Sequence, residues 1–271
     1  MVGIYTWLGF KYPFEEIIKY IKNAGFQSVI TWWGDDFREV YGPKESEPDI
    51  IRKYGLIIEN THFPFDDSND IWVDSQNGQE LLKKYLSYID DCKTYEIPAA
   101  VVHVSNGDNP PPYGQLGLDR FKQLTEKAEK NNVTIALENL HRPDYLDFVF
   151  DSIESDKLKF CYDCGHENCF THGINYLEKY GDKLAALHLH DNNGSRDEHL
   201  LPFKGTVNWK YIMGQLNAID YKGPITLEVD AQFIDITKEY TVEEFLSEAF
   251  KRANKLAGMH LHPENQATAT L

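Results

Sequence analysis

The sequence lacks any long apolar run. No stretch of its 271 residues approaches the about 18 apolar residues that a membrane-spanning helix needs. The opening MVGIYTWLGF also lacks the basic segment, apolar core and small-residue cleavage site of a secretory signal. We therefore expect a soluble, cytoplasmic protein with no membrane partner.

Cysteine is scarce. The chain has four, and Cys161, Cys164 and Cys169 fall close together. This number does not resemble a disulfide framework in a chain of this length. A cysteine zinc site is also disfavoured, because the second pair that would complete it is missing and Cys161 and Cys164 have opposite strand parity. Buried, reduced thiols explain the cluster adequately.

Nucleotide-binding motifs and excess positive charge are absent too. Neither G-x-G-x-x-G nor G-x-x-x-x-G-K-[ST] follows any apolar run. Lysine and arginine number 27 against 43 aspartates and glutamates, which gives a net charge of −16. Such a chain repels polyanions on average, so nucleic acid is a disfavoured partner unless a positive cleft or a metal cluster acts locally.

Apolar runs and helical segments alternate along the chain. The apolar runs of strand length are 3–7, 26–33, 56–63, 99–105, 134–140, 158–166, 184–191 and 224–229. Helical periodicity covers 14–24, 79–95, 118–131, 209–218 and 242–256. The pattern is typical of a parallel sheet buried on both faces, and eight units favour closure over an open doubly wound sheet. The predicted fold is α/β: a single (β/α)8 barrel over residues 1–258, followed by a tail at 259–271.

Six of the expected strands end in a residue type that binds metal. These residues are His62, His103, Glu138, Asp163, His188 and Glu228. Glu138 shares a strand face with Thr134 and Ala136, so its side chain can point into the barrel. Two carboxylates facing each other there would repel unless a cation or a proton lay between them. A metal resolves the conflict.

Further donors lie close to these strand ends. His166 follows Asp163 by three residues, His190 follows His188 by two, and Asp197 and His199 occupy the next loop. Any one of these histidines is more often a hydrogen-bonded structural residue than a ligand. Their clustering favours a functional site. Aromatic residues near strand ends, among them Trp7 and Trp32, fit a pocket lining and ordinary packing about equally well.

Several motifs together resemble the xylose-isomerase-like barrel superfamily. They are IALENL around Glu138, YDCGH at 162–166, LHLHDNNG from Leu187, DEHLLP from Asp197, GTVNW from Gly205 and TLEV around Glu228. This superfamily includes sugar and sugar-phosphate isomerases and epimerases, inosose-handling enzymes and endonuclease IV. The resemblance implies that Glu138, Asp163, His188 and Glu228 hold one divalent ion. We choose His188 over His190 because the family has an acidic residue three positions after its ligand, and Asp191 lies there.

The resemblance to endonuclease IV implies additional metal ligands for a three-zinc cluster. The matching positions are His62, His103, His166, Asp197 and His199. One departure weighs against this reading. Lys204 stands where endonuclease-like and many isomerase-like sequences have glutamate.

The first functional hypothesis is an isomerase or epimerase of a small sugar, sugar phosphate or polyol ketone, with Mn, Zn, Co or Mg as cofactor. Glu138 and Glu228 would move the proton of an enediolate path that the ion stabilises. The expected substrate contacts are His62, His166, Arg196, Trp7 and Trp32. The alternatives are a multi-zinc phosphoester hydrolase and, least favoured, a non-catalytic ligand-binding barrel. The sequence leaves a homo-oligomer open.

Overall fold

The computed structural model describes residues 1–231 and 241–261. The strands are β1 (Val2–Tyr5), β2 (Ser28–Trp32), β3 (Ile57–His62), β4 (Ala99–His103), β5 (Thr134–Glu138), β6 (Leu158–Asp163), β7 (Leu184–His188) and β8 (Ile225–Leu227). The α-helices are α1 (Phe14–Ala24), α2 (Arg38–Tyr41), α3 (Glu47–Lys53), α4 (Gln76–Thr94), α5 (Gln115–Asn131), α6 (Pro143–Ser152), α7 (Cys164–Phe170), α8 (Tyr176–Tyr180), α9 (Trp209–Ala218) and α10 (Val242–Leu261).

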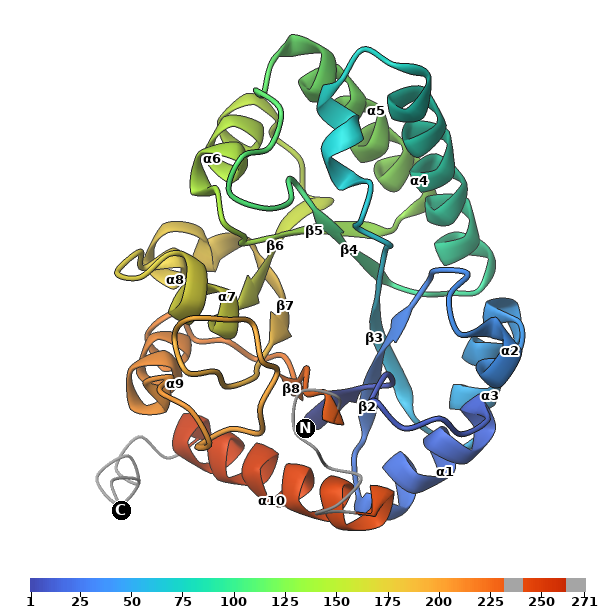
Figure 1. The fold of residues 1–271 in the computed structure, drawn as a ribbon, viewed down its shortest axis with the longest axis vertical. Coiled ribbons are helices and arrows are strands. Elements are labelled where there is room, and N and C mark those ends of the chain that lie inside the picture. The colour runs from blue at the N-terminus through green and yellow to red at the C-terminus, as the bar shows by residue number, and fades with distance from the viewer. Residues whose placement is uncertain (232–240, 262–271) are drawn as a thin grey trace.

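The eight strands form one parallel sheet that closes on itself. Neighbouring strands follow in the order β7-β6-β5-β4-β3-β2-β1-β8. Closure between β7 and β8 comes from a parallel bridge that joins Leu189 to Leu227. There the Leu189 N–H donates to the Thr226 carbonyl at 3.1 Å, and the Glu228 N–H donates to the Leu189 carbonyl at 3.1 Å. The predicted single (β/α)8 barrel is confirmed, with its helices arranged around the strands (Figure 1).

Amphipathic helices cover the outside of the barrel. In α1, Phe14, Ile17, Ile18 and Ile21 are buried, and their spacing places them on one helix face. The helix ends at Gly25, whose φ of 107° lies in the left-handed region that glycine adopts without strain. Helix α1 lies beside α10, and α4 lies beside α5 (Figure 1).

Small side chains fill the centre of the barrel. Val101, Ala136, Cys161 and Ala186, from four adjacent strands, form a separate buried cluster. Layers of this kind make a barrel interior a packed core. All four cysteines are free. Cys161 therefore serves as a small apolar side chain beneath the strand ends.

Several boundaries differ from the sequence-based expectation, and two of them matter for the site and for the chain end. The sixth strand was expected to reach His166, but it ends at Asp163, and Cys164–Phe170 forms helix α7. Asp163 caps this helix, because its carboxylate accepts the His166 backbone N–H at 2.6 Å. At the chain end, α10 runs on to Leu261, past the expected barrel limit of residue 258. The remainder of the expected tail, 262–271, lies outside the described residues.

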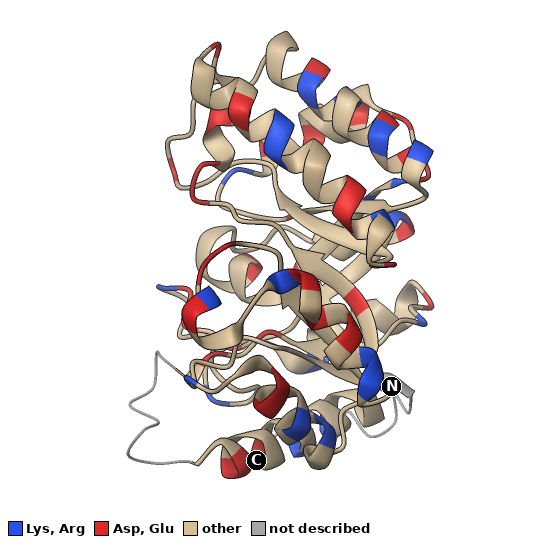
Figure 2. Cartoon of the chain, turned by 90° about the vertical axis from the view of Figure 1, so that its right-hand side faces the viewer, with Lys and Arg blue, Asp and Glu red and all other residues tan. Residues whose placement is uncertain are grey.

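Charges of both signs are interspersed on the outer helices (Figure 2). The net charge of −16 is therefore spread over the surface together with the basic residues. Within residues 1–231 and 241–261, no helix combines the length and the apolar character that crossing a membrane requires.

A pair of glycine substitutions tests the helix packing. A Cβ at Gly117 in α5 would lie 2.0 Å from the Trp72 ring, whereas one at Gly214 in α9 meets nothing within 4 Å. Trp72 has little freedom to move, because its indole N–H donates to the Val104 carbonyl at 2.8 Å. We expect Gly117→Ala to lower the free energy of unfolding by roughly 1–3 kcal/mol through overpacking. Gly214→Ala should be neutral or raise it by about 0.5–1 kcal/mol. Urea denaturation measures both, and equal effects would contradict the packing described.

Candidate active site

The six residues at strand ends that we expected to include metal ligands meet at one mouth of the barrel. His62, His103, Glu138, Asp163 and His188 are the last residues of β3 to β7, and Glu228 follows the last residue of β8. The strand register places His103 beside Glu138 and Asp163 beside His188. Because all the strands are parallel, their carboxyl ends share this mouth.

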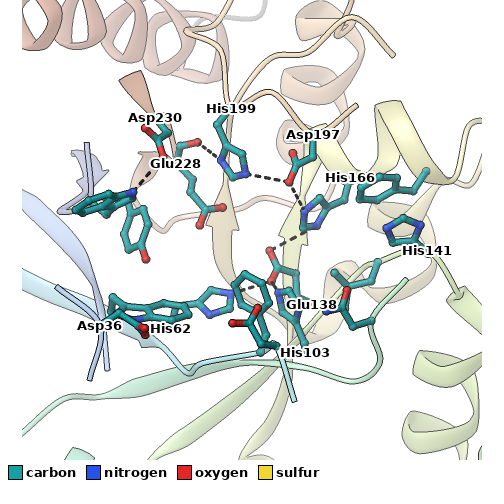
Figure 3. A pocket seen from close by; sticks show the side chains of 18 of the residues that line it. Asp36, His62, His103, Glu138, His141, His166, Asp197, His199, Glu228 and Asp230 are labelled. Carbon is teal, nitrogen blue, oxygen red and sulfur yellow. Dashed lines mark hydrogen bonds and ion pairs between the residues drawn. The ribbon is translucent and has the colours of Figure 1, made fainter. Parts of the chain in front are cut away.

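Glu138 lies at the centre of the cluster (Figure 3). Its Oε2 lies 3.1 Å from His62 Nε2 and 2.9 Å from His103 Nε2. Its Oε1 lies 2.7 Å from His188 Nδ1. The Glu138 side chain is 1% exposed. A carboxylate buried to this extent requires hydrogen bonds or positive charge, which the surrounding imidazoles supply. Burial lowers the pKa of His103 to about 4, so this ring is neutral near pH 7 and contributes a hydrogen bond.

Among several groups of donors at the mouth, one group of four buried side chains could hold a metal ion. One ligand atom each from Glu138, Asp163, His188 and Glu228 lies within 4.8 Å of the others. Glu228 Oε2 lies 3.0 Å from the same His188 Nδ1 that contacts Glu138. Three carboxylates and one imidazole suit a divalent ion such as Mn²⁺, Zn²⁺, Co²⁺ or Mg²⁺. The donor set therefore fits the divalent ion that the sequence suggested. The buried carboxylates would also repel one another without a cation between them.

A second group of donors surrounds Asp197. Its Oδ2 lies 3.2 Å from His166 Nε2 and 2.9 Å from His199 Nε2 (Figure 3). His199 also contacts the Glu228 carbonyl through Nδ1 at 2.9 Å, so this group adjoins the first. His190 is fully buried between the two, with Nε2 3.1 Å from Asp163 and 3.4 Å from Asp197.

The pKa values of these groups indicate an ion-pair network. Burial alone raises the pKa of Glu138, but the charge of His188 and hydrogen bonds from His103, His188 and His62 outweigh it and hold the pKa well below its usual range. The pKa of Glu228 falls to about 2, because His188 likewise outweighs burial. Burial lowers the pKa of His199, but the charge and hydrogen bond of Asp197 raise it to about 10. Protons on imidazoles thus balance the carboxylates.

A buried aspartate organises the loop that carries Asp197 and His199. Both oxygens of Asp191 accept hydrogen bonds, from the backbone N–H groups of Asn192 (3.0 Å), Lys204 (3.1 Å) and Val207 (3.0 Å) and from the indole N–H of Trp209 (3.0 Å). These partners lie on both sides of the loop. Sequence reasoning used Asp191 only to choose His188, and the structure assigns it the task of closing the loop.

Helix α7 is held tightly against the same region. A Cβ at Gly165 would lie 1.9 Å from the His190 ring, so only glycine allows this approach. This glycine lies in the first turn of the helix. Asn139 joins β5 to β6, since its amide donates to the Asp163 carbonyl and accepts the Asp163 N–H, each at 2.8 Å. Asp163 and His166 thereby face the same mouth.

Above these donors lies a cavity of about 460 Å³. This volume falls within the usual ~300–1,000 Å³ of small-molecule sites. Its lining consists of Tyr5, Trp7, Trp32, Asp36, Phe37, His62, Phe65, Asp66, His103, Asn106, Glu138, Leu140, His141, His166, Phe170, Asp197, His199, Glu228 and Asp230. Aromatic faces and ionisable groups thus share one space.

The expected substrate contacts fall into two groups. Trp7, Trp32, His62 and His166 line the cavity. Arg196 does not: its side chain is 77% exposed and pairs with Glu198 at 3.4 Å. Among the other aromatic residues near strand ends, Tyr5 lines the cavity. Trp33, Phe63 and Trp72 are buried in the core.

Sequence reasoning missed several lining residues, including Asp36, Asp66, His141, Phe170 and Asp230. Most of them come from segments between a strand and the following helix, where no periodicity indicates which way a side chain points. Asp230 carried a usable signal, because it lies two residues after Glu228 and alternation would place both on one side.

The chain is similar to several known proteins. A family model described as a xylose isomerase-like TIM barrel matches residues 18–248. The chain belongs to this family. Among its relatives, the 2-oxo-tetronate isomerase of Haemophilus influenzae is 26% identical over 238 residues, which cover 80% of this chain and 87% of that protein. The D-psicose 3-epimerase of Enterocloster bolteae is 32% identical over 118 residues, 40% of this chain and 37% of that protein.

A solved D-tagatose 3-epimerase-like protein has the same fold as this family member. The two chains superpose with a TM-score of 0.74 and 20% sequence identity, over 99% of each. The match to the first two curated relatives spans only 60% and 62% of their lengths. The likeness to the solved structure therefore shows the fold, while the reaction needs separate argument.

Replacing Asp191 tests its role in the loop. Asp191→Asn exchanges one accepting oxygen for a donor, so at least one of the four N–H groups loses its partner. We expect the free energy of unfolding to fall by about 1–3 kcal/mol and the amides of Lys204 and Val207 to exchange with solvent faster, as hydrogen–deuterium exchange would show. Asp182→Asn, at an exposed position before β7, is the control. Unchanged amide protection in Asp191→Asn would contradict the anchoring role.

Metal uptake should release protons. Burial lowers the pKa of His188, but Cys161, Glu228 and Glu138 outweigh it and raise the pKa well above the ordinary value, so the imidazole carries a proton near pH 7. A metal ligand must lose that proton. Below the raised pKa, falling pH therefore opposes binding, by about tenfold per pH unit for each proton displaced. Calorimetry in two buffers of different ionisation enthalpy counts the protons. The exposed His172→Gln serves as control, and metal binding independent of pH would refute the expectation.

Proposed function

We propose that the chain is a divalent-metal-dependent isomerase or epimerase of a small carbohydrate, acting through an enediolate. The observation that carries the proposal is the pair of carboxylates at the floor of the cavity: Glu138 and Glu228 lie 2.7 Å and 3.0 Å from one nitrogen of His188. Two carboxylates around a common point suit the transfer of a proton from one face of a substrate carbon to the other.

The metal ligands in this proposal are Glu138, Asp163, His188 and Glu228. Their mutual distances within 4.8 Å support the assignment. When bound, a divalent ion supplies Lewis-acid polarisation of a carbonyl oxygen, which acidifies the neighbouring C–H bond. The native ion would be Mn, Zn, Co or Mg.

The catalytic roles fall to the two glutamates. One carboxylate removes the proton next to the carbonyl, and the other returns a proton to the same or the neighbouring carbon. The depressed pKa values of Glu138 and Glu228 support this, since both groups are ionised and ready to accept a proton at neutral pH. A fixed distance between base and substrate carbon is what makes weak bases effective.

The remaining lining would bind and orient the substrate. His62 and His166 lie beside Glu138 and Asp197 and can hydrogen-bond hydroxyl groups. Trp7 and Trp32 offer flat apolar faces on the cavity wall. Arg196 is left out of this role because its side chain lies outside the lining.

Relatives support the reaction class. The Haemophilus influenzae protein is named a 2-oxo-tetronate isomerase, and the Enterocloster bolteae protein a D-psicose 3-epimerase. Both names describe rearrangement beside a carbonyl group of a small carbohydrate. We take the same chemistry for this chain, with the individual substrate open.

Hydrogen exchange in deuterium oxide tests the proposal directly. Metal-loaded protein incubated with candidate ketoses should exchange a hydrogen bonded to the carbon beside the carbonyl, and NMR would detect this before net conversion. Glu138→Gln and Glu228→Gln should each lower the exchange rate by about 10²–10⁴, because each replacement preserves volume but removes a base. Glu80→Gln, at an exposed position on α4, should keep the wild-type rate. Wild-type exchange in either active-site variant would refute the assigned roles.

A second candidate is a multi-zinc phosphoester hydrolase like endonuclease IV. The specific observation in its favour is that all the additional donors lie at the mouth, His62 and His103 on Glu138, and His166 and His199 on Asp197. The net charge of −16 weighs against a nucleic-acid substrate. Metal analysis of protein purified without chelator separates the candidates: one ion per chain supports the isomerase. Three ions, with zinc-dependent phosphoester cleavage and no exchange on any sugar, would replace it.

A further inference from the structure

Two tryptophan–aspartate pairs form one wall of the cavity. The Trp7 indole N–H donates to Asp230 at 3.1 Å, and the Trp32 indole N–H donates to Asp36 at 3.2 Å. The Trp7 ring also stacks on Phe37, with 3.9 Å between ring centroids and 16° between planes. Each indole is therefore held by a carboxylate at its edge. Figure 3 shows Asp36 and Asp230 across the cavity from His166.

This wall lies within the reach of a small carbohydrate bound at the floor. Trp32 stacks on His62, with 5.7 Å between ring centroids. His62 in turn lies 3.1 Å from Glu138. Only the His62 ring separates Glu138 from Trp32, so a ligand that touches Glu138 can extend along the Trp32 face toward Asp36.

Negative charge dominates the lining. Its carboxylates are Asp36, Asp66, Asp197, Asp230, Glu138 and Glu228. In the part of the lining that the structure describes, histidine is the only residue type that can carry positive charge. Basic residues in the neighbouring segments are paired: Arg38 with Glu47 and Lys44 with Asp35, each at 2.5 Å, and Arg142 with Asp144 at 2.7 Å.

The charge distribution bears on which carbohydrate can bind. A metal ion held by Glu138, Asp163 and Glu228 compensates charge at the floor, while Asp36 and Asp66 belong to other segments of the lining. A phosphate group carries about −1.5 to −2 charges at pH 7. On a substrate whose carbonyl end lies at the floor, that group would face the aspartates of the wall. Asp36 and Asp66 are themselves exposed, so water and salt screen part of this repulsion, which is strongest at low ionic strength.

We propose that this pocket takes a carbohydrate without a phosphate group, an unphosphorylated sugar or polyol ketone. The inference rests on the proposed function and narrows it, because that function left sugar phosphates open. The C–H face of the ligand packs on the Trp7 and Trp32 rings, whose faces carry partial negative charge that suits polarised C–H bonds. Hydroxyl groups at the far end donate hydrogen bonds to Asp36 or Asp66, which accept them without repulsion.

Matched ligand pairs test the proposal. Quenching of tryptophan fluorescence in the metal-loaded full chain gives Kd for several pentuloses and hexuloses and for the terminal phosphate ester of each. We expect the neutral member of each pair to bind at least about tenfold more tightly. A phosphate group can also contact the metal, which would tighten binding of the ester. The comparison of Kd values is therefore weighted against the proposed preference for the neutral sugar. Equal or tighter binding of the esters, or no binding of any neutral member, would overturn the proposal.

Charge variants identify the cause of the preference. Asp36→Asn keeps an oxygen that can accept the Trp32 N–H, and Asp66→Asn is similarly conservative. Each should tighten binding of the phosphate esters by about 3- to 10-fold relative to the neutral sugars. The matched control, Asp182→Asn, removes the same charge at an exposed position outside the lining and should leave that ratio unchanged. A ratio that shifts equally in all three variants would contradict a local effect.

The two proposals fail in different ways. If neutral sugars bind preferentially but no carbon-bound hydrogen exchanges, the reaction class is wrong and the ligand class stands. If phosphate esters bind more tightly and undergo exchange, the reaction class stands and the ligand class is wrong.

Discussion

The structure depends on the burial of several carboxylates at one end of a barrel. Glu138, Asp163 and Glu228 lie close together with little access to water. Such a group is stable only with compensating positive charge, because desolvating a lone carboxylate is expensive. Around Glu138, His188 provides positive charge and His62 and His103 provide further polar contacts. A divalent ion would do so more strongly by replacing protons.

The surrounding architecture holds this charged cluster in place. Parallel strands bring the donors to one mouth, and small residues such as Ala136 and Ala186 fill the core below them. Asp191 closes the loop that carries Asp197 and His199, and Asn139 links β5 to β6 beneath Asp163. Polar groups that are fully paired can be buried without a net penalty and fix one arrangement. The positions of the side chains at the mouth are therefore fixed by neighbouring residues that do not touch the substrate in the proposed reaction.

The cavity joins two environments with different tasks. Its floor gathers groups that can bind an ion and move protons, whereas its wall presents indole faces held by Asp36 and Asp230. Binding energy from such a wall is available to orient a substrate over the floor. The abundance of donors also explains why the sequence motifs resemble both one-ion and multi-ion enzymes. The additional histidines can serve as substrate contacts in one case and as ligands in the other.

The amino-acid sequence alone determined the barrel and the residues at its strand ends. Period-two and 3.6-residue patterns are local, so they identify strands and helices and place Glu138 and His188 at carboxyl ends without knowledge of the fold. Tertiary structure decided what local patterns do not encode. In the folded chain, β6 ends at Asp163 and His166 contacts Asp197. Arg196 lies outside the cavity, whereas Asp36 lies in its wall. These outcomes depend on loop conformations and on contacts between residues far apart in the chain, because a loop side chain acquires its direction only from the groups it packs against.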